Sequence, residues 1–309
     1  MSGDGEWRQE LDEQQLEDVR GLLLAVREAD GRPEVAPEGP LPGEFDGGEH
    51  LVACVEGEVV GYAHLDTTGD SFGHQVAELF VHPAHRGRGY GATLLQALDE
   101  RAAVGFRVWA HGDHPAARRL ALKAGLERKR ELLILHTLVE GADWPEPVLR
   151  DGVSLRTFVP GQDEDAVICV NALAFDWHPE QGALTADDVR ADERRPWFDA
   201  DGFFLAVLEG TADGSPNDTV IGFHWTKVHE PTPGRFDGER VGEVYVVGVD
   251  PAAQGGGLGR ALTLAGLRYL AGRGLRQIIL YVEGDNAPAL AVYTKLGFTR
   301  HETDVQYGR

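Results

Sequence analysis

The sequence predicts an α/β protein made of two tandem domains of the same fold, each a mixed, mostly antiparallel sheet flanked by helices. Three observations support this fold class. A chain of 309 residues is long enough for two domains with separate cores. Apolar strand patterns alternate with amphipathic helix patterns along the chain. One long pattern also occurs twice, with Pro83 and Pro251 at equivalent positions 168 residues apart.

Each copy of the repeat has the same order of expected elements. Two strands joined by a turn come first, and a third apolar strand then leads into a glycine-rich turn that opens onto an amphipathic helix. Another strand, a polar turn, a second helix and a last strand complete the copy. In the first copy the strands are expected at 50–55, 59–65, 78–83 and 106–110, the glycine-rich turn at 86–91, the first helix at 92–101 and the end of the second helix at 123–126. In the second copy the strands are expected at 203–208, 220–227, 246–251 and 278–282, the glycine-rich turn at 254–259, the first helix at 260–271 and the end of the second helix at 295–298.

The segment between the copies predicts the domain boundaries. Residues 141–147 include Pro145 and Pro147 and show no hydrophobic periodicity, which is typical of a linker. We therefore expect an N-terminal domain over residues 1–140, a linker over 141–152 and a C-terminal domain over 153–309.

Composition excludes several classes of function. With 29 Lys and Arg against 51 Asp and Glu, the formal charge of −22 disfavours nucleic acid and anionic membranes as partners. No apolar stretch approaches the roughly 18 residues of a spanning helix, and the N-terminus resembles no signal peptide. Cys54 and Cys169 lie far apart and predict neither a disulfide framework nor a zinc site. We expect a monomeric cytoplasmic protein without a metal, and the absence of a G-x-S-x-G elbow gives a hydrolase no support.

The glycine-rich turn is the most informative motif. It has the form [Arg/Gln]-x-x-Gly-x-Gly, and it begins at Arg86 in the first copy and at Gln254 in the second. Such a turn presents backbone N–H groups at the start of a helix, which attracts phosphate. Glycine lets a pyrophosphate approach the backbone closely. The spacing fits neither the Walker nor the dinucleotide motif, so ATP and NAD are disfavoured.

At these residues the sequence resembles the GCN5-related N-acetyltransferase (GNAT) superfamily, whose acetyl-CoA turn has the pattern Q/R-x-x-G-x-G/A. A single glycine turn is weak evidence, because glycine accounts for 40 of the 309 residues. The match is strong because it occurs twice, each time after a strand and before a helix. The resemblance implies two GNAT domains, acetyl-CoA as co-substrate and acetyl transfer to an amine.

The second copy carries candidates for the chemistry of acetyl transfer. Amide formation from a thioester requires an acceptor for the amine proton, a donor to the carbonyl oxygen and a proton for the departing thiolate. Glu243 is the candidate base, directly or through water, and Tyr293 is the candidate acid. Gly248 inside an apolar strand indicates a splay or bulge at 247–249, where a backbone N–H would bind the thioester oxygen. A solvated role for Glu243, and packing of Tyr293 against Phe298, are the alternatives.

The first copy lacks the equivalent groups. Ala121 is at the position of Tyr293, and Glu78 aligns with Val246 rather than with Glu243. We therefore expect catalysis in the C-terminal domain, while the N-terminal domain keeps the fold and a CoA pocket without catalysis.

Four stretches, at 178–182, 222–229, 242–246 and 280–283, extend the resemblance well beyond the glycine turns. In them the chain resembles a family of tandem GNAT enzymes that acetylate the cysteinyl amine of cysteinyl-glucosaminyl-inositol, the last step of mycothiol biosynthesis. The resemblance implies that the acceptor is held by Glu38, Glu180, Lys227, Glu243 and Tyr281. Glu44 competes with Glu38, because this loop aligns with the family only through gaps.

The same resemblance assigns acetyl-CoA contacts in both copies. In the second copy they are Val247, Gly248, Val249, Gln254, Gly255, Gly256, Gly257, Leu258, Gly259, Arg260, Asn286, Ala287, Pro288, Ala289, Leu290 and Ala291. In the first copy they are Leu79, Phe80, Val81, Gly87, Arg88, Gly89, Tyr90, Gly91 and Ala92. The family commonly has arginines at Gly255 and Gly256, so we expect this turn to rely on backbone N–H groups and to bind CoA more weakly.

Two other functions stay open from the sequence. One is a GNAT enzyme that acetylates a different small-molecule or protein amine, and the other is a non-catalytic acyl-CoA sensor. Glu243 and Tyr293 in one half of the chain argue against the sensor.

Overall fold

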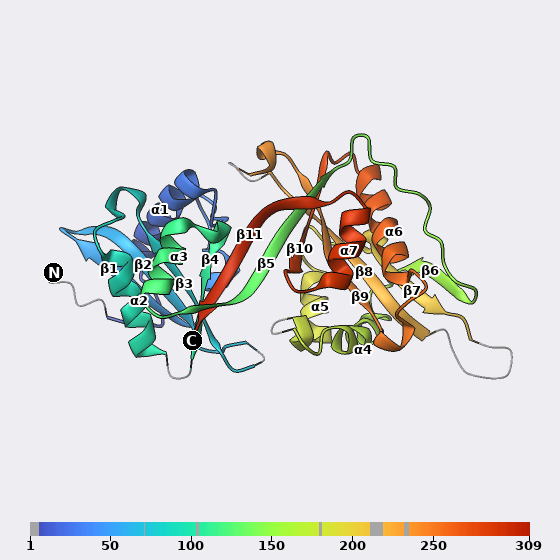
Figure 1. Ribbon diagram of the computed structural model, residues 1–309, viewed down its shortest axis with the longest axis horizontal. Helices are drawn as coiled ribbons and strands as arrows, with labels where there is room; N and C mark the ends of the chain where they lie inside the picture. Colours follow the sequence, from blue (N-terminus) through green and yellow to red (C-terminus); the bar gives the residue numbers. More distant parts are fainter. Residues whose placement is uncertain (1–5, 71, 103–104, 179–180, 211–218, 232–234) are drawn as a thin grey trace. The chain divides into compact units, whose positions relative to one another are not determined.

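The computed structural model describes residues 6–70, 72–102, 105–178, 181–210, 219–231 and 235–309 (Figure 1). The chain forms two compact units, one comprising Met1–Leu132 with Thr303–Arg309 and the other Leu133–Glu302. These boundaries differ from those expected from the sequence, because the last strand of each half crosses from one unit into the other. None of the described helices is long and apolar enough to cross a membrane.

The first unit is a mixed sheet with helices on both faces (Figure 1). Its strand order is β1-β2-β3-β4-β11. Strands β3 and β4 are parallel, while β1–β2, β2–β3 and β4–β11 are antiparallel. Its elements are α1 (Glu13–Asp30), β1 (Glu49–Val55), β2 (Glu58–Asp66), β3 (Gln75–Val81), α2 (Tyr90–Arg101), β4 (Phe106–Ala110), α3 (Pro115–Lys123) and the first half of β5 (Glu127–Leu138), joined by the end of β11 (Thr299–Gly308).

The core of the first unit has two layers. On one face, Leu94 and Leu98 of α2 and Ala121 of α3 pack against the sheet. On the other face, Val19 and Leu23 of α1 pack against apolar residues of β2 and β3. This two-sided burial gives the α/β layering that the alternating pattern predicted.

The second unit repeats this plan and has the strand order β5-β10-β9-β8-β7-β6. Only β9 and β10 are parallel among its described pairings, and β6–β7, β7–β8 and β8–β9 are antiparallel. Its elements are β6 (Val153–Thr157), α4 (Glu164–Ala174), α5 (Ala186–Asp192), β7 (Phe203–Leu208), β8 (Thr219–His229), β9 (Val241–Val249), α6 (Leu258–Gly272), β10 (Gln277–Glu283), α7 (Ala287–Lys295) and the start of β11.

Helices α6 and α7 cover one face of this sheet, and α4 and α5 cover the other. His224 and Trp225 are almost fully buried on β8, as the apolar strand pattern predicted. A Cβ added at Gly266 of α6 would lie 2.0 Å from the His224 ring, so this helix position accepts only glycine. The contact fixes α6, and with it the glycine turn that precedes the helix.

The segment expected to be a linker packs against the second unit. Trp144 is 9% exposed in the core formed by β10, α6 and α7. Its Nε1 donates to the carbonyl of Leu296 over 3.0 Å, and Nη1 of Arg268 donates to the carbonyl of Trp144 over 2.7 Å. Residues before β6 are therefore part of the second unit rather than a free connection.

Candidate active site

The two parallel strand pairs separate at the same place in each unit. The pairing of β9 with β10 ends at Val244 and Leu280, and that of β3 with β4 ends at Ala77 and Val108. Beyond these points one edge of β9, and likewise of β3, loses its partner across the parallel pair. A backbone N–H there is available to a ligand.

The splay agrees with the sequence, but the expected bulge at Gly248 is wrong. Gly248 pairs regularly with Phe223, and the register shift lies at Tyr245, between the pairs Trp225–Val246 and Thr226–Val244. Close packing explains the glycine instead, because a Cβ at Gly248 would lie 2.6 Å from the Phe223 ring. The bulge at Tyr245 changes which side chains of β9 face each side of the sheet.

After β9, three consecutive glycines form the turn that begins α6. Gly255, Gly256 and Gly257 have φ of +92°, +58° and +81°, in the left-handed region that other residues avoid. Gly257 is the N-cap residue of α6. The turn therefore places backbone N–H groups at the N-terminus of α6, where the helix dipole favours an anion.

A cavity of about 590 Å³ adjoins this turn in the second unit. Tyr293 lies in its wall, so the phenol shares a space with the turn. Among the residues predicted to bind acetyl-CoA, those lining it are Val247, Val249, Gln254, Gly255, Gly259, Asn286, Pro288 and Ala289. Those not lining it are Gly248, Gly256, Gly257, Leu258, Arg260, Ala287, Leu290 and Ala291. The sequence reasoning missed Ala174, Phe175, Trp177, Thr263, Asp285 and Val292, which also line it.

Tyr293 combines the two roles that the sequence left open. Its ring packs edge-on against Phe298 with centroids 5.8 Å apart. Burial also raises the pKa of Tyr293 to about 12, so the phenol keeps its proton at neutral pH. A protonated phenol on a cavity wall can donate to a departing anion.

Glu243 does not line this cavity. The bulge at Tyr245 places Val244 in the core beneath α6 and Tyr245 in the core beneath α4, so Glu243 faces the α4 side of the sheet. Its carboxylate is 6% exposed, and its Oε2 lies 2.5 Å from Nε2 of His229. Glu243 therefore faces the α4 side of β9 without lining the donor cavity, which is bounded by residues of α6 and α7 and also by Ala174 and Phe175 at the end of α4.

Lys227 pairs with Glu243 across β8 and β9 and has two aromatic neighbours. Its Nζ lies 4.6 Å from the ring centre of Trp197 and 4.8 Å from that of Tyr245. Burial, then the charges of Asp192 and Glu243, raise the pKa of Tyr245 to about 12. A cation held between two rings in this way is well ordered.

Of the other predicted acceptor residues, the structure describes Tyr281 and Glu38. Tyr281 is half-buried on β10, two residues beyond Ile279, the partner of Glu243. Glu180 lies outside the described residues. Glu38 is exposed in the first unit, and its competitor Glu44 lies near Glu78, since desolvation and the charge of Glu78 raise the pKa of Glu44.

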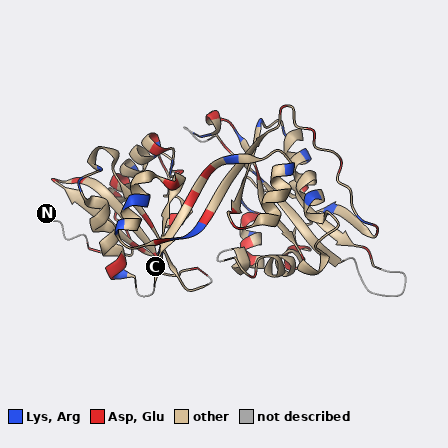
Figure 2. Cartoon of the chain, in the orientation of Figure 1, with Lys and Arg blue, Asp and Glu red and all other residues tan. Residues whose placement is uncertain are grey.

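The first unit has a cavity of about 500 Å³ beside its own glycine turn. Every first-copy residue predicted to contact acetyl-CoA lines it except Arg88. The lining side chains that sequence reasoning missed include Arg32, Trp109, His111, His114, Arg119 and Lys123. Their basic character, set against the acidic chain as a whole (Figure 2), was not visible from the glycine motif.

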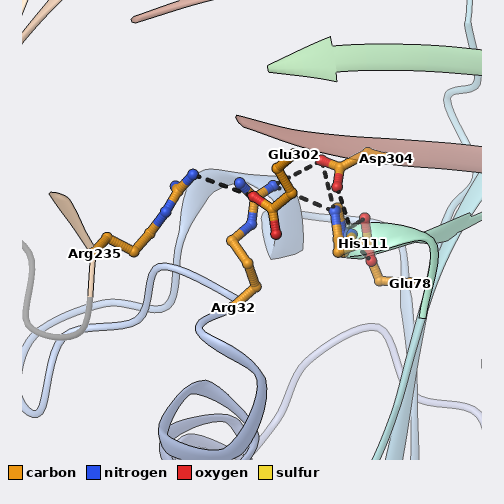
Figure 3. Close-up of polar contacts among 7 residues, drawn as sticks. Arg32, Glu78, His111, Arg235, Glu302 and Asp304 are labelled. Carbon is orange, nitrogen blue, oxygen red and sulfur yellow. Dashed lines mark hydrogen bonds and ion pairs between the residues drawn. The ribbon is translucent and has the colours of Figure 1, made fainter. Parts of the chain in front are cut away.

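Figure 3 shows an ion cluster of the first unit, two of whose members, Arg32 and His111, line this cavity. His111 Nε2 is 3.1 Å from Glu78, its Nδ1 is 3.1 Å from Asp304, and Arg32 is 3.0 Å from Asp304. Burial alone would lower the pKa of His111, but the carboxylates of Glu78 and Asp304 raise it to about 10. Glu78 is thus bound to a cation, and Ala121 replaces the phenol of the second unit.

The second turn also has a cationic neighbour that the motif did not indicate. A Cβ added at Gly256 would lie 3.9 Å from Cδ of Arg150, whose side chain is exposed. Arg150 comes from the segment before β6 and brings a guanidinium beside a turn that has glycines where arginines were expected.

Comparison with known proteins agrees with the duplicated fold. Residues 170–298 match the family described as "Acetyltransferase (GNAT) family", and residues 46–125 match "Acetyltransferase (GNAT) domain". A GCN5-related N-acetyltransferase from Sphaerobacter thermophilus shares the fold with a TM-score of 0.68 at 23% identity, covering 98% of this chain and 95% of that one. A tandem GNAT protein of the clavulanic acid pathway has a TM-score of 0.66 at 19% identity, covering 98% of each chain.

Full-length relatives share much more of the sequence. The mycothiol acetyltransferase of Amycolatopsis mediterranei is 89% identical over 100% of both chains. That of Saccharomonospora viridis is 63% identical over 98% of both chains. That of Streptomyces coelicolor is 48% identical over 96% of this chain and 93% of the relative. The chain therefore belongs to the GNAT superfamily of acetyl-CoA-dependent N-acetyltransferases and, within it, to the mycothiol acetyltransferase family.

Proposed function

We propose that the second unit transfers the acetyl group of acetyl-CoA to the cysteinyl amine of cysteinyl-glucosaminyl-inositol, which completes mycothiol. The observation that carries the proposal is the cavity that brings the glycine turn and Tyr293 together, beside the splayed strand β9 that also carries Glu243. A thioester bound in this cavity would have the phenol of Tyr293 in the cavity wall.

The donor site suits acetyl-CoA. The N–H groups of the turn and the α6 N-terminus would bind the diphosphate. Arg150 would add the positive charge that Gly255 and Gly256 do not supply. Apolar walls, including Val247, would contact the pantetheine arm, and a free N–H on β9 would donate to the thioester oxygen.

The chemistry follows from the proton positions. Glu243 takes a proton from the cysteinyl ammonium, and the nitrogen lone pair then attacks the thioester carbon. The C–S bond breaks as the amide forms, and Tyr293 protonates the departing thiolate. The second proton that the nitrogen loses returns to the Tyr293 phenolate and restores the phenol. The raised pKa of Tyr293 supports this role, because the phenol is protonated when the thiolate forms.

The acceptor face is suited to a cationic, hydroxyl-rich substrate. Glu243 attracts the ammonium, and the ordered ammonium of Lys227 can donate to sugar or inositol hydroxyls. Tyr281 would add a phenolic hydrogen bond, and Glu180 and Glu38, with Glu44 as its competitor, complete the proposed set.

The first unit is proposed to bind a second acetyl-CoA without catalysis. Its cavity of about 500 Å³ adjoins a glycine turn and carries Arg119 and Lys123, which suit phosphates. Its carboxylate, Glu78, is already paired with His111. Calorimetry should give two bound acetyl-CoA molecules per chain. A wild-type chain that binds only one acetyl-CoA, and that loses it when Gly257 is changed, would contradict this.

We also propose that the enzyme works as a monomer in the cytoplasm. Each cavity is lined by residues of one unit, so neither needs a second copy of the chain. Both cysteines, Cys54 and Cys169, are free, as a reducing compartment would leave them. Light scattering would test the first point, and fractionation of the source cells the second.

The test of the main proposal is detection of the N-acetylated product by mass spectrometry, with acetyl-CoA and the cysteinyl amine as substrates. Glu243→Gln should lower kcat/KM by roughly 10²- to 10⁴-fold, as for a lost general base. Glu209→Gln, at an exposed carboxylate of the same unit, is the matched control and should keep wild-type rates. Turnover of an unrelated amine with no product from this one would favour a different acceptor, and CoA binding without release by any amine would favour a sensor.

A further inference from the structure

Glu243 makes its shortest described side-chain contact with His229. Nε2 of the ring lies 2.5 Å from Oε2 of the carboxylate, and the two residues come from adjacent strands, β8 and β9. His229 pairs with Val241, two positions from Glu243, so the contact runs diagonally along one face of the sheet. The sequence offered no role for this histidine.

The reaction creates a need for a proton path at this point. An ammonium loses two protons when it becomes an amide, and the departing thiolate takes up only one of them. One proton per turnover must therefore leave the site. Glu243 is the group that accepts it, and its side chain is only 6% exposed.

His229 provides the exit that Glu243 lacks. Its side chain is 25% exposed, four times as much as the carboxylate that it contacts. Within the described part of the chain, its Nδ1 has no hydrogen-bond partner, so the far nitrogen of the ring is available to water. An imidazole can accept a proton at one nitrogen and release one from the other.

We propose that His229 is a proton relay that returns Glu243 to its carboxylate form in each turnover, an inference that rests on the proposed acetyl transfer. The proton moves from the carboxyl oxygen of Glu243 to Nε2 of His229, and the proton on Nδ1 passes to water. Exchange with water, in which Nδ1 gains a proton and Nε2 loses one, restores the starting tautomer. No group is oxidised or reduced, and the net result is one proton delivered to solvent.

Several charged groups set the electrostatic surroundings of this pair. Lys227 on β8 lies beside Glu243, and Tyr245 on β9 has its pKa raised by burial, by Asp192 on α5 and by Glu243. Beyond the ends of the two strands, Arg240 and Glu230 form an exposed ion pair with each other.

The first variant keeps the contact and removes the relay. In His229→Gln the amide can still donate to Glu243, but it cannot carry a proton at neutral pH. We expect kcat to fall by roughly 10²-fold with little change in either KM, and we expect the dependence of kcat on pH near neutrality to change shape. Equal kcat values and superimposable pH profiles for the variant and the wild type would overturn the proposal.

A second variant distinguishes a relay from a merely structural role. His229→Ala should be slow and should regain part of its rate when imidazole is added to the buffer, in proportion to the imidazole concentration. His301→Ala, an exposed histidine of the same unit, is the matched control and should keep the wild-type rate with no response to imidazole. A slow His229→Ala enzyme that imidazole does not accelerate would contradict the relay.

A measurement without substrates tests the contact directly. The NMR chemical shifts of the His229 ring in the free protein should change when Glu243→Gln replaces the carboxylate, whereas those of the His301 ring should stay the same. Unchanged His229 chemical shifts would refute the pairing on which the relay depends. Failure of wild-type enzyme to make product would instead refute the proposed function, so the two failures are distinguishable.

Discussion

Acid should destabilise the second unit through one buried histidine, His224. Its Nδ1 donates to the carbonyl of Leu262 over 2.7 Å, so the ring is neutral with an unprotonated Nε2. That nitrogen is buried and has no hydrogen-bond partner among the described residues. A proton added there would be a buried charge without an acceptor. Burial accordingly lowers the pKa of His224 to about 4.

The size of the effect follows from linkage. The unfolded chain binds a proton at His224 with a pKa near 6.5, and the folded chain does so only near 4. The free energy of unfolding therefore falls as the pH drops from 6.5 through 4. The gap between the two pKa values corresponds to about 3 kcal/mol in full, of which about 2 kcal/mol is lost between pH 7.5 and pH 5. This is a large part of the roughly 5 to 15 kcal/mol that stabilises a typical domain.

Native-state hydrogen exchange of peptides from α6 would measure this loss. The free energy of opening should fall by about 2 kcal/mol more in the wild type than in His224→Asn between the two pH values. His50, whose pKa burial and His64 lower to about 4, is present in both proteins and cancels in the comparison. Equal losses in the two proteins would refute the argument, whatever the stability of the variant at pH 7.5.

Three further predictions concern the donor site. Tyr293→Phe should lower kcat with little change in the KM for acetyl-CoA, because the ring still fills the cavity wall, and a change confined to KM would contradict its role as acid. Gly257→Ala should weaken acetyl-CoA binding and lower the free energy of unfolding by about 1 to 2 kcal/mol, because alanine is strained at φ of +81°. Calorimetry would measure the binding and thermal unfolding the stability, and neither would change if the turn tolerates a side chain. Arg150→Ala should raise the KM for acetyl-CoA about fivefold, equivalent to about 1 kcal/mol, and flatten its dependence on salt. A salt dependence equal to that of the wild type would show that Arg150 does not interact with the phosphates of acetyl-CoA.

The sequence predicted the parts of the fold that depend on local patterns. The duplicated order of strands and helices, the mixed sheet and the GNAT family are confirmed. They could be predicted because hydrophobic periodicity and glycine spacing are properties of short stretches of sequence. The bulge was misplaced because Gly248 has two possible reasons to be glycine. Only the packing of Phe223, a residue of another strand, distinguishes them.

The site was predicted less completely for the same reason. Tyr293 and the turn have positions that the repeat identifies, and both lie at the cavity. His229 and Arg150 come from segments outside the glycine motif, and only the sheet register and the fold of the chain bring them to Glu243 and Gly256. No spacing rule along the sequence connects such pairs.

The course of β11 has a consequence for how the protein is made. Thr303–Arg309 belong to the first unit and pair with β4, although all of Leu133–Glu302 precedes them in the chain. When the ribosome has synthesised only the first half, the sheet therefore still lacks the strand that lies between β4 and β5, and Asp304 is not yet present to bind His111. Maturation of the earlier half must wait for synthesis of the later one, which reverses the usual vectorial order in which the leading domain is finished first.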